Sequence, residues 1–412
     1  RKKIVFTLLI LLIYRVGNAI PVPYVDVAAL TAYLDSMSTT VLGLYNVMSG
    51  GAFADATVFA LSIQPYINAS IIIQLLTVAI PALERMAREE GEEGRKKIAS
   101  ITRYTTVAIA LIQGFAYYML MRNQYNILTN DSIAAAFVII ITFVAGSAFI
   151  MWLGEQITEF GIGNGISIIL FASIISRIPS GVSTMYNNRE VLGVVGVVGI
   201  VVGLLALVVL ITHVYNAERR IPVQYAKRQV GRKMYGGQNT TLPVKVNMSG
   251  VLPIIFAQSI AMLPATVAAF LPKPAEGTFW YGFIQAIDTR SVLYMIAYFL
   301  MIIGFSYFYA TIQFNPTEIA NNLKRNGGFV PGFRPGKPTA DFIAKVLSRI
   351  TLFGAIYLGV VAIAPLVAGK FISIQGLAIG GTSIIIVVGV ALETVKALEN
   401  QMLARQYKGF LE

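Results

Sequence analysis

The side chains that most often carry out chemistry in proteins are scarce in this sequence. Its 412 residues include no cysteine and a single histidine, His213. Disulfides and thiol chemistry are therefore excluded, and a zinc or iron site lacks its usual ligands. We find no Ser-His-Asp set within the apolar segments, no phosphate-cradling glycine loop and no HExxH motif. The sequence predicts a protein that is not an enzyme and that uses no metal or cofactor.

Carboxylates are also sparse where the chain is most apolar. Glu155, Glu159 and Glu393 lie near the ends of apolar segments rather than within them. A calcium or magnesium site needs clustered carboxylates, and an ion-coupled transporter usually keeps an acidic residue at mid-membrane. These observations count against a secondary transporter of small solutes, which we keep as an alternative hypothesis.

The elements that must position any functional residue are membrane-spanning helices. The chain is 56% hydrophobic and only 13% charged, whereas soluble domains average about 25% charged residues. Continuous apolarity without strict alternation favours helices over barrel strands, and about 20 apolar residues cross a bilayer. Ten such segments are present, at about 4–20, 57–80, 104–121, 133–153, 162–178, 191–215, 250–272, 291–313, 341–368 and 374–398.

The orientation of these spans follows from the distribution of lysine and arginine. With a cytoplasmic N-terminus, one face carries 25 of the 32 basic residues by count, and cytoplasmic loops are usually the basic ones. No small-x-small site follows the first apolar segment, so we expect an uncleaved span there. Ten spans divide into an N-terminal half, 1–180, and a C-terminal half, 181–412. An odd number of spans in each half inverts one half relative to the other.

Two segments need separate interpretation. Residues 41–56 are half apolar, glycine-rich and too short to cross a membrane. They form either a surface loop or a short re-entrant helix that caps a cavity, because irregular backbone at membrane depth is tolerated only inside protein or beside water. The segment 191–215 carries glycines at three- and four-residue spacing from Gly193 to Gly203. This spacing predicts close packing against a neighbouring helix.

Two basic loops on the cytoplasmic face, 216–248 and 314–340, are longer than minimal connectors. Their basicity reflects either the positive-inside rule alone or a docking surface for an acidic or RNA-bearing partner. Ordered-looking turn chemistry, such as Val330-Pro331-Gly332, favours docking. The docking residues that we assign in the first loop are Arg219, Arg220, Lys227, Arg228, Arg232 and Lys233.

Seven stretches of the sequence, polar loops among them, carry a family resemblance. They read SIQPYINASIIIQLLTVAIP (62–81), GRKKIASITRY (94–104), GIGNGISIIL (161–170), ERRIPVQYAKRQVGRK (218–233), LPVKVNMSGVLPIIFAQSI (242–260), FNPTEIANNLKRNGGFVPGFRPG (314–336) and GGTSIIIVVGVALET (380–394). In this order, and over nearly the whole chain, they resemble the bacterial SecY family. Members of that family are the pore subunits of the channel that moves proteins across the cytoplasmic membrane.

The resemblance implies an all-α polytopic membrane protein with ten transmembrane helices in two inverted pseudo-symmetric halves around a central pore. It implies that residues 41–56 form a short re-entrant plug helix, which contains Leu44, Tyr45, Met48, Gly50 and Gly51. It also implies an apolar ring at the narrowest point of the pore, formed by Ile63, Ile67, Leu170, Ile174, Ile255 and Ile386. The four-residue spacing within each pair puts both side chains on one helix face.

A lateral gate is implied between the second and third spans on one side and the seventh and eighth on the other. Its polar residues are Gln64, Asn68, Gln258 and Ser259. Arg334 matches a position that engages the cytoplasmic motor. The implied partners are SecE-like and SecG-like small membrane subunits, the SecA motor ATPase, the ribosome, preproteins with signal sequences, and membrane lipids.

The implied location is the bacterial cytoplasmic membrane, with both termini in the cytoplasm. Energy would come from a partner ATPase or a translating ribosome, because the chain has no nucleotide motif of its own. A lipid scramblase or insertase without a through-pore remains a third hypothesis, in which substrates contact only the lateral gate.

Overall fold

The structure of the protein is a computed structural model that is mainly helical. It describes residues 2–36, 41–88, 91–123, 127–225, 228–230, 233–235, 239–247, 250–270, 278–288, 291–371 and 381–408. Ten helices of this described part coincide with the ten predicted spans. They are α1 (Lys2–Gly17), α4 (Gln64–Ala79), α6 (Gly91–Arg122), α7 (Ile133–Phe160), α8 (Gly165–Ser176), α10 (Arg189–Asn216), α11 (Leu252–Phe270), α13 (Val292–Gln313), α15 (Lys337–Phe371) and α16 (Gly381–Lys408).

The lengths of these helices agree with a polytopic membrane protein. Within the described residues, six helical stretches are by themselves long and apolar enough to cross a membrane. A seventh arises if α4 and α5 (Pro81–Arg88), which bend by 106° at their junction, count as one span. Polar residues define several helix starts: the side chain of Ser132 accepts a hydrogen bond from the Ala135 amide, and Asn164 accepts from the Ile166 amide. Such caps satisfy backbone donors that helices leave unpaired.

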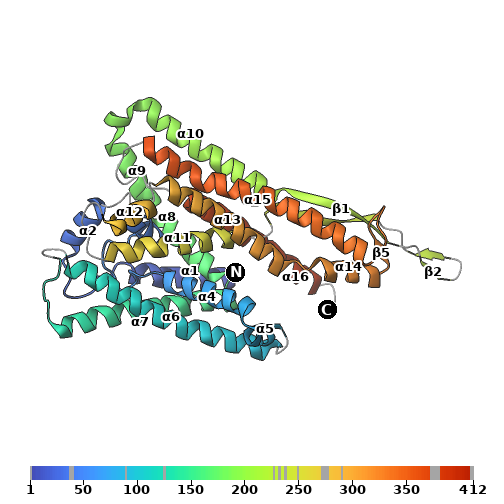
Figure 1. Cartoon of the computed structure of the whole chain (residues 1–412), viewed down its shortest axis with the longest axis horizontal. Helices are drawn as coiled ribbons and strands as arrows, with labels where there is room; N and C mark the ends of the chain where they lie inside the picture. The colour runs from blue at the N-terminus through green and yellow to red at the C-terminus, as the bar shows by residue number, and fades with distance from the viewer. Residues whose placement is uncertain are drawn as a thin grey trace.

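The helices form two groups in space (Figure 1). The early helices α1, α4, α6 and α7, coloured blue to cyan, lie along one side, and α10, α13, α15 and α16 lie along the other. Helices α8 and α11 lie between the groups, where α11 contacts α4 and α6, and α8 contacts α16. One hydrophobic cluster joins residues from both groups, and a second lies within the later helices.

Shorter elements lie at the two ends of the molecule. At one end are α2 (Val27–Ser36), α9 (Ile178–Asn187) and α12 (Phe279–Ile287). At the other end are α14 (Pro316–Arg325) and the strands (Figure 1). Helices α2 and α12 were not predicted from the sequence, because neither is long enough to stand out against the apolar spans.

The basic loop 216–248 is a β-ribbon rather than an irregular connector. Strands β1 (Glu218–Tyr225) and β4 (Asn239–Lys245) pair antiparallel, and β5 (Gly328–Phe329) from the second basic loop pairs with the far end of β1. A separate hairpin consists of β2 (Arg228–Val230) and β3 (Lys233–Tyr235). Alternate residues of β1, Ile221 and Val223, are buried, which is the period-two pattern of a sheet with one covered face. The two predicted docking loops therefore form one sheet.

Two predictions from the sequence are wrong. The second span was expected to begin at residue 57, but helix α4 begins at Gln64, and positive φ angles of 41° at Ala56 and 52° at Ser62 interrupt the backbone before it. The glycines of α10 were expected to pack against a neighbouring helix, but a Cβ atom at Gly199 or Gly203 would have nothing within 4 Å among the described residues. Helix α10 is mostly exposed in this chain, and glycine spacing alone does not reveal what surrounds a helix.

Candidate pore ring, plug and lateral seam

The six predicted ring residues come together in one hydrophobic cluster. Each is at most 5% exposed, and they come from α4 and the residue before it, α8, α11 and α16. Ile63 is the residue before α4, and Pro65 follows in the first turn, where proline needs no amide hydrogen bond. Branched apolar side chains from α4, α8, α11 and α16 thus belong to one continuous buried core.

The predicted plug segment packs against this cluster. Residues 41–48 form helix α3 (Val41–Met48), which contacts α8 and α11. Leu42, Tyr45 and Met48 are buried in the same cluster as the ring residues. The backbone of Leu44 lies in this helix. The surface-loop interpretation of residues 41–56 does not fit this placement, because α3 and the turns after it are largely buried.

The segment after α3 is held by hydrogen bonds rather than by regular structure. The Tyr45 hydroxyl donates to the Leu61 carbonyl at 3.0 Å, and the Asn46 side chain accepts from the Ala54 amide at 3.0 Å. The Tyr117 hydroxyl of α6 donates to the Phe53 carbonyl. Since buried polar backbone needs partners, these side chains allow an irregular segment to lie inside the molecule.

The segment carries a charged group near its C-terminal end. Partial burial raises the pKa of the Asp55 carboxyl, and the positive charges of Arg177 and Arg15 oppose that rise. The plug segment thus ends on the only acidic residue among 41–56, with two arginines near it.

The predicted gate residues lie at the contact between the two groups of helices. The side-chain amide of Gln64 on α4 donates to the Ser259 hydroxyl on α11 at 3.1 Å. The amide of Gln258 donates to the Met48 sulfur at 3.4 Å, so this residue contacts the plug. Asn68 is buried, and its Oδ1 atom has no hydrogen-bond partner among the described residues. We call the contact of α4 with α11 and α13 the seam.

A further polar contact across the seam was missed from the sequence. The Tyr309 hydroxyl on α13 donates to Gln74 Oε1 on α4 at 2.5 Å. The Tyr309 ring packs on Phe256 of α11 with a centroid distance of 5.2 Å. Gln74 is a polar residue inside an apolar span, which is the signal that could have identified it. Its partner could not be identified, because Tyr309 is distant in the chain.

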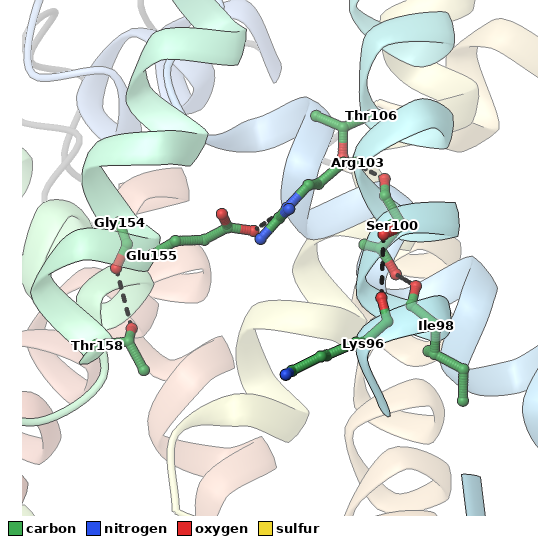
Figure 2. Close-up of polar contacts among 9 residues, drawn as sticks. Lys96, Ile98, Ser100, Arg103, Thr106, Gly154, Glu155 and Thr158 are labelled. Atoms are coloured by element: carbon green, nitrogen blue, oxygen red, sulfur yellow. Dashed lines mark hydrogen bonds and ion pairs between the residues drawn. The ribbon is translucent and has the colours of Figure 1, made fainter. Parts of the chain in front are cut away.

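An ion pair joins α6 to α7 beside α4 (Figure 2). Arg103 Nε lies 2.9 Å from Glu155 Oε1, and Figure 2 shows the two side chains reaching toward each other from their helices. A cavity of about 570 Å³ lies here and is lined by Tyr66, Arg103, Met151, Trp152, Gly154, Glu155, Gln156, Thr158, Glu159, Asn164 and Ile166. The Glu155 carboxylate at this span end is thus paired with Arg103.

The predicted docking residues lie at one end of the molecule, on and near the sheet. Arg219 and Arg220 are exposed on β1, and Arg220 pairs with Glu218 at 2.7 Å. Arg334 is exposed in the turn after β5. The backbone of Arg228 lies in β2 and that of Lys233 in β3. Lys227 and Arg232 lie outside the described residues.

The sheet carrying these residues is fixed to the membrane helices by a small core. Ile221 and Val244 from the strands pack with Val330, Ile343 and Leu347. The last two belong to α15. The exposed basic side chains are therefore carried by a sheet that packs against the long helix α15.

Comparison with known proteins agrees with this architecture. The SecY family model matches residues 57–395. The protein translocase subunit SecY of Streptomyces scabiei is 45% identical over 426 residues, covering 100% of this chain and 97% of that protein.

Two solved structures share the fold. One is a structure of a SecY protein, in which the plug domain stabilises the closed state of the translocation channel and maintains a membrane seal. It has a TM-score of 0.68 at 18% identity, covering 98% of this chain and 92% of that one. The other, Sec61 in the canine ribosome–channel complex from the endoplasmic reticulum, has a TM-score of 0.66 at 16% identity, with coverage of 98% and 92%. The family match, the full-length relatives and the shared fold establish that this chain belongs to the SecY family.

Proposed function

We propose that this chain is the pore subunit of a protein-conducting channel, with the cluster of six apolar residues as its constriction. The observation that carries the proposal is that four helices distant in sequence bring Ile63, Ile67, Leu170, Ile174, Ile255 and Ile386 into one buried cluster with the plug. We further propose that residues 1–180 and 181–412 act as two halves around this pore.

The chemistry of the ring suits an unselective passage for polypeptides. Branched apolar side chains offer no hydrogen bonds to ions, and a narrow apolar constriction excludes water. Such side chains also make no directional bonds, so a passing chain of any sequence is contacted without being held. A closed arrangement is supported by the burial of the ring residues, each at most 5% exposed, in the same hydrophobic cluster as Met48 of α3.

The seam is the proposed exit toward lipid. Its direct contacts include two side-chain hydrogen bonds, Gln64 to Ser259 and Tyr309 to Gln74. Hydrogen bonds between membrane helices contribute about 0.6 to 2 kcal/mol each. A seam of this kind is stable when empty, yet an apolar helix that replaces its contacts can separate it.

Partners and orientation form the finer part of the proposal. The channel lies in the bacterial cytoplasmic membrane with both termini cytoplasmic, and the basic sheet therefore faces the cytoplasm. Because a ribosome is strongly anionic, the exposed Arg219 and Arg220 suit contact with it, and Arg334 would contact a SecA motor. SecE-like and SecG-like subunits would complete the complex, and the substrates are preproteins with signal sequences.

A single-cysteine cross-link tests the proposal, and the absence of native cysteine makes it clean. The Ile67→Cys channel is reconstituted with its motor, and a precursor that carries one cysteine is stalled in mid-transit. We expect a disulfide that depends on ATP and on the signal sequence. Cysteines at Gln64 and Gln258 serve as matched positions in the seam. Efficient cross-linking there and none at Ile67 would mean that chains travel along the seam, as a scramblase or insertase predicts.

A further inference from the structure

The turn that follows the plug helix lies directly on α8. At Gly50 and Gly51 the φ angles are +70° and +93°, which favour glycine. A Cβ atom at Gly50 would lie 3.1 Å from Ser176 Oγ and 3.2 Å from the Ser173 carbonyl oxygen. A Cβ atom at Gly51 would lie 2.9 Å from Arg177 Nη1. The two glycines therefore permit both the turn and its close approach to α8.

A buried cluster of hydroxyl groups surrounds the same turn. The Tyr14 hydroxyl of α1 lies 2.7 Å from Ser173 Oγ of α8 and 3.5 Å from the Ser49 carbonyl oxygen, to which it donates. Asn18 donates to the same carbonyl at 3.4 Å. Ser49 and Ser173 are both fully buried, at 0% exposure. Three elements, namely α1, the end of α3 and α8, thus meet through one polar contact within an apolar core.

The position of Ser173 on α8 connects this cluster to the pore ring. Ser173 lies between Leu170 and Ile174, so the helix that carries two ring residues also carries the plug contact. A shift of α8 relative to α1 that widens the ring would therefore move Ser173 away from Tyr14. The cluster is also incompletely bonded, because the buried Asn18 Oδ1 has no partner among the described residues. An incompletely satisfied polar cluster is easier to separate than a complete one.

We propose that Tyr14, Ser49 and Ser173 form a latch that couples the pore ring to the plug. In the closed channel the hydroxyl contacts hold the turn at Ser49–Gly51 on α8. When a substrate pushes α8 outward, the contact of Tyr14 with Ser173 breaks and the plug is released. The two seals then open together rather than independently. This inference rests on the proposed function, since it assigns gating residues to the same pore.

The test uses Tyr14→Phe, Ser173→Ala and the double variant, each in channels reconstituted in proteoliposomes with their small membrane subunits. Tyr14→Phe removes the hydroxyl and keeps the ring, which stacks on Phe59 at a centroid distance of 5.9 Å. We expect each single variant to raise substrate-free ion conductance about 3- to 10-fold. A neutral buried hydrogen bond has that order of effect. The double variant should match Tyr14→Phe and fall short of the product of the two single effects, because Tyr14→Phe already removes the contact with Ser173.

A second readout follows the plug itself. A single cysteine at Ala52, which is 1% exposed, is reacted with a bulky water-soluble maleimide. The reaction should accelerate by a similar factor in the latch variants. Ser167→Ala is the matched control, because it removes another buried hydroxyl from α8 that makes no hydrogen bond to the plug among the described residues.

Three outcomes overturn the latch: conductance and labelling that match the Ser167→Ala control, effects that multiply in the double variant, or a conductance increase without faster labelling. In each of these cases the cysteine cross-link at Ile67 still decides whether the chain is a channel. If the Ile67→Cys channel without latch substitutions forms no cross-link, the proposed function is refuted, whatever the latch variants do.

Discussion

At the scale of single residues, the proposed ring is notable for its apolar side chains, which carry no charge and form no hydrogen bonds. The ring residue Ile386 is 1% exposed and contacts other apolar side chains. The side chains of the proposed ring neither donate nor accept hydrogen bonds, so the contribution that we propose for them is exclusion of water and ions. A polar group buried at such a position loses its hydration and gains no hydrogen-bond partner. This desolvation costs about 1–3 kcal/mol of free energy.

Ile386→Asn tests this view of the ring. The amide destabilises the closed ring, because it is desolvated only when the ring is shut. We expect the variant channel to transport precursors with defective signal sequences, which the unaltered channel rejects. Transport of matched intact and defective precursors measures the effect. Ile386→Val, which stays apolar, should keep the requirement for a signal, and an unchanged requirement in Ile386→Asn would contradict the role of the ring.

At the scale of elements, the seam is defined by helices that touch through few polar bonds. Helix α4 bonds to α11 through Gln64 and to α13 through Gln74, about three helical turns apart. Apolar contacts between membrane helices are replaced readily by lipid or by a signal helix. The two hydrogen bonds are therefore the parts of the seam that an entering helix must exchange.

Tyr309→Phe should make the seam easier to open. The variant loses the bond to Gln74 but keeps the aromatic contact with Phe256. Loss of about 0.6–2 kcal/mol corresponds to roughly a 3- to 30-fold shift toward the open seam. Cross-linking of a weak signal sequence to a cysteine in the seam measures it. Tyr307→Phe, whose hydroxyl bonds to Ser348 of α15 instead, should leave cross-linking unchanged, and equal behaviour of the two variants would count against the seam bond.

At the scale of the whole molecule, the end that carries the sheet is the proposed place of partner binding, because exposed basic residues lie there. The net charge is +12, and the exposed Arg219, Arg220 and Arg334 lie at the end that carries the sheet. A concentration of positive charge accelerates association with anionic partners. The sheet packs on α15 through Ile343 and Leu347.

Arg334→Glu should weaken motor-driven transport without affecting folding. The Arg334 side chain is exposed, and the Arg334 backbone carbonyl accepts a hydrogen bond from the Thr339 hydroxyl at 2.8 Å. Motor binding should fall most at low salt, because the attraction between exposed charges is screened at high ionic strength. Arg334→Lys keeps the charge and should retain part of the binding. Normal transport by a well-expressed Arg334→Glu channel would refute this docking residue.

The sequence by itself determined the membrane class, the ten spans and the family. Long, continuously apolar segments form helices in lipid, because a helix satisfies its own backbone hydrogen bonds. The segments that were predicted wrongly lack that constraint. Residues 57–63 are apolar but not helical, because they line the irregular region held by Tyr45 and Tyr117. The sheet at the basic end was also not predicted, since the strands that pair in it are not adjacent in the sequence.

Only the tertiary structure decided which residues meet. The six ring residues could be proposed through the family resemblance, but their spacing in the sequence does not bring α4, α8, α11 and α16 together. The bonds of Tyr309 to Gln74 and of Tyr14 to Ser173 join residues that are 235 and 159 positions apart. Local patterns encode helices, whereas contacts of this range depend on how complete helices pack, and that packing places both the pore and its proposed latch.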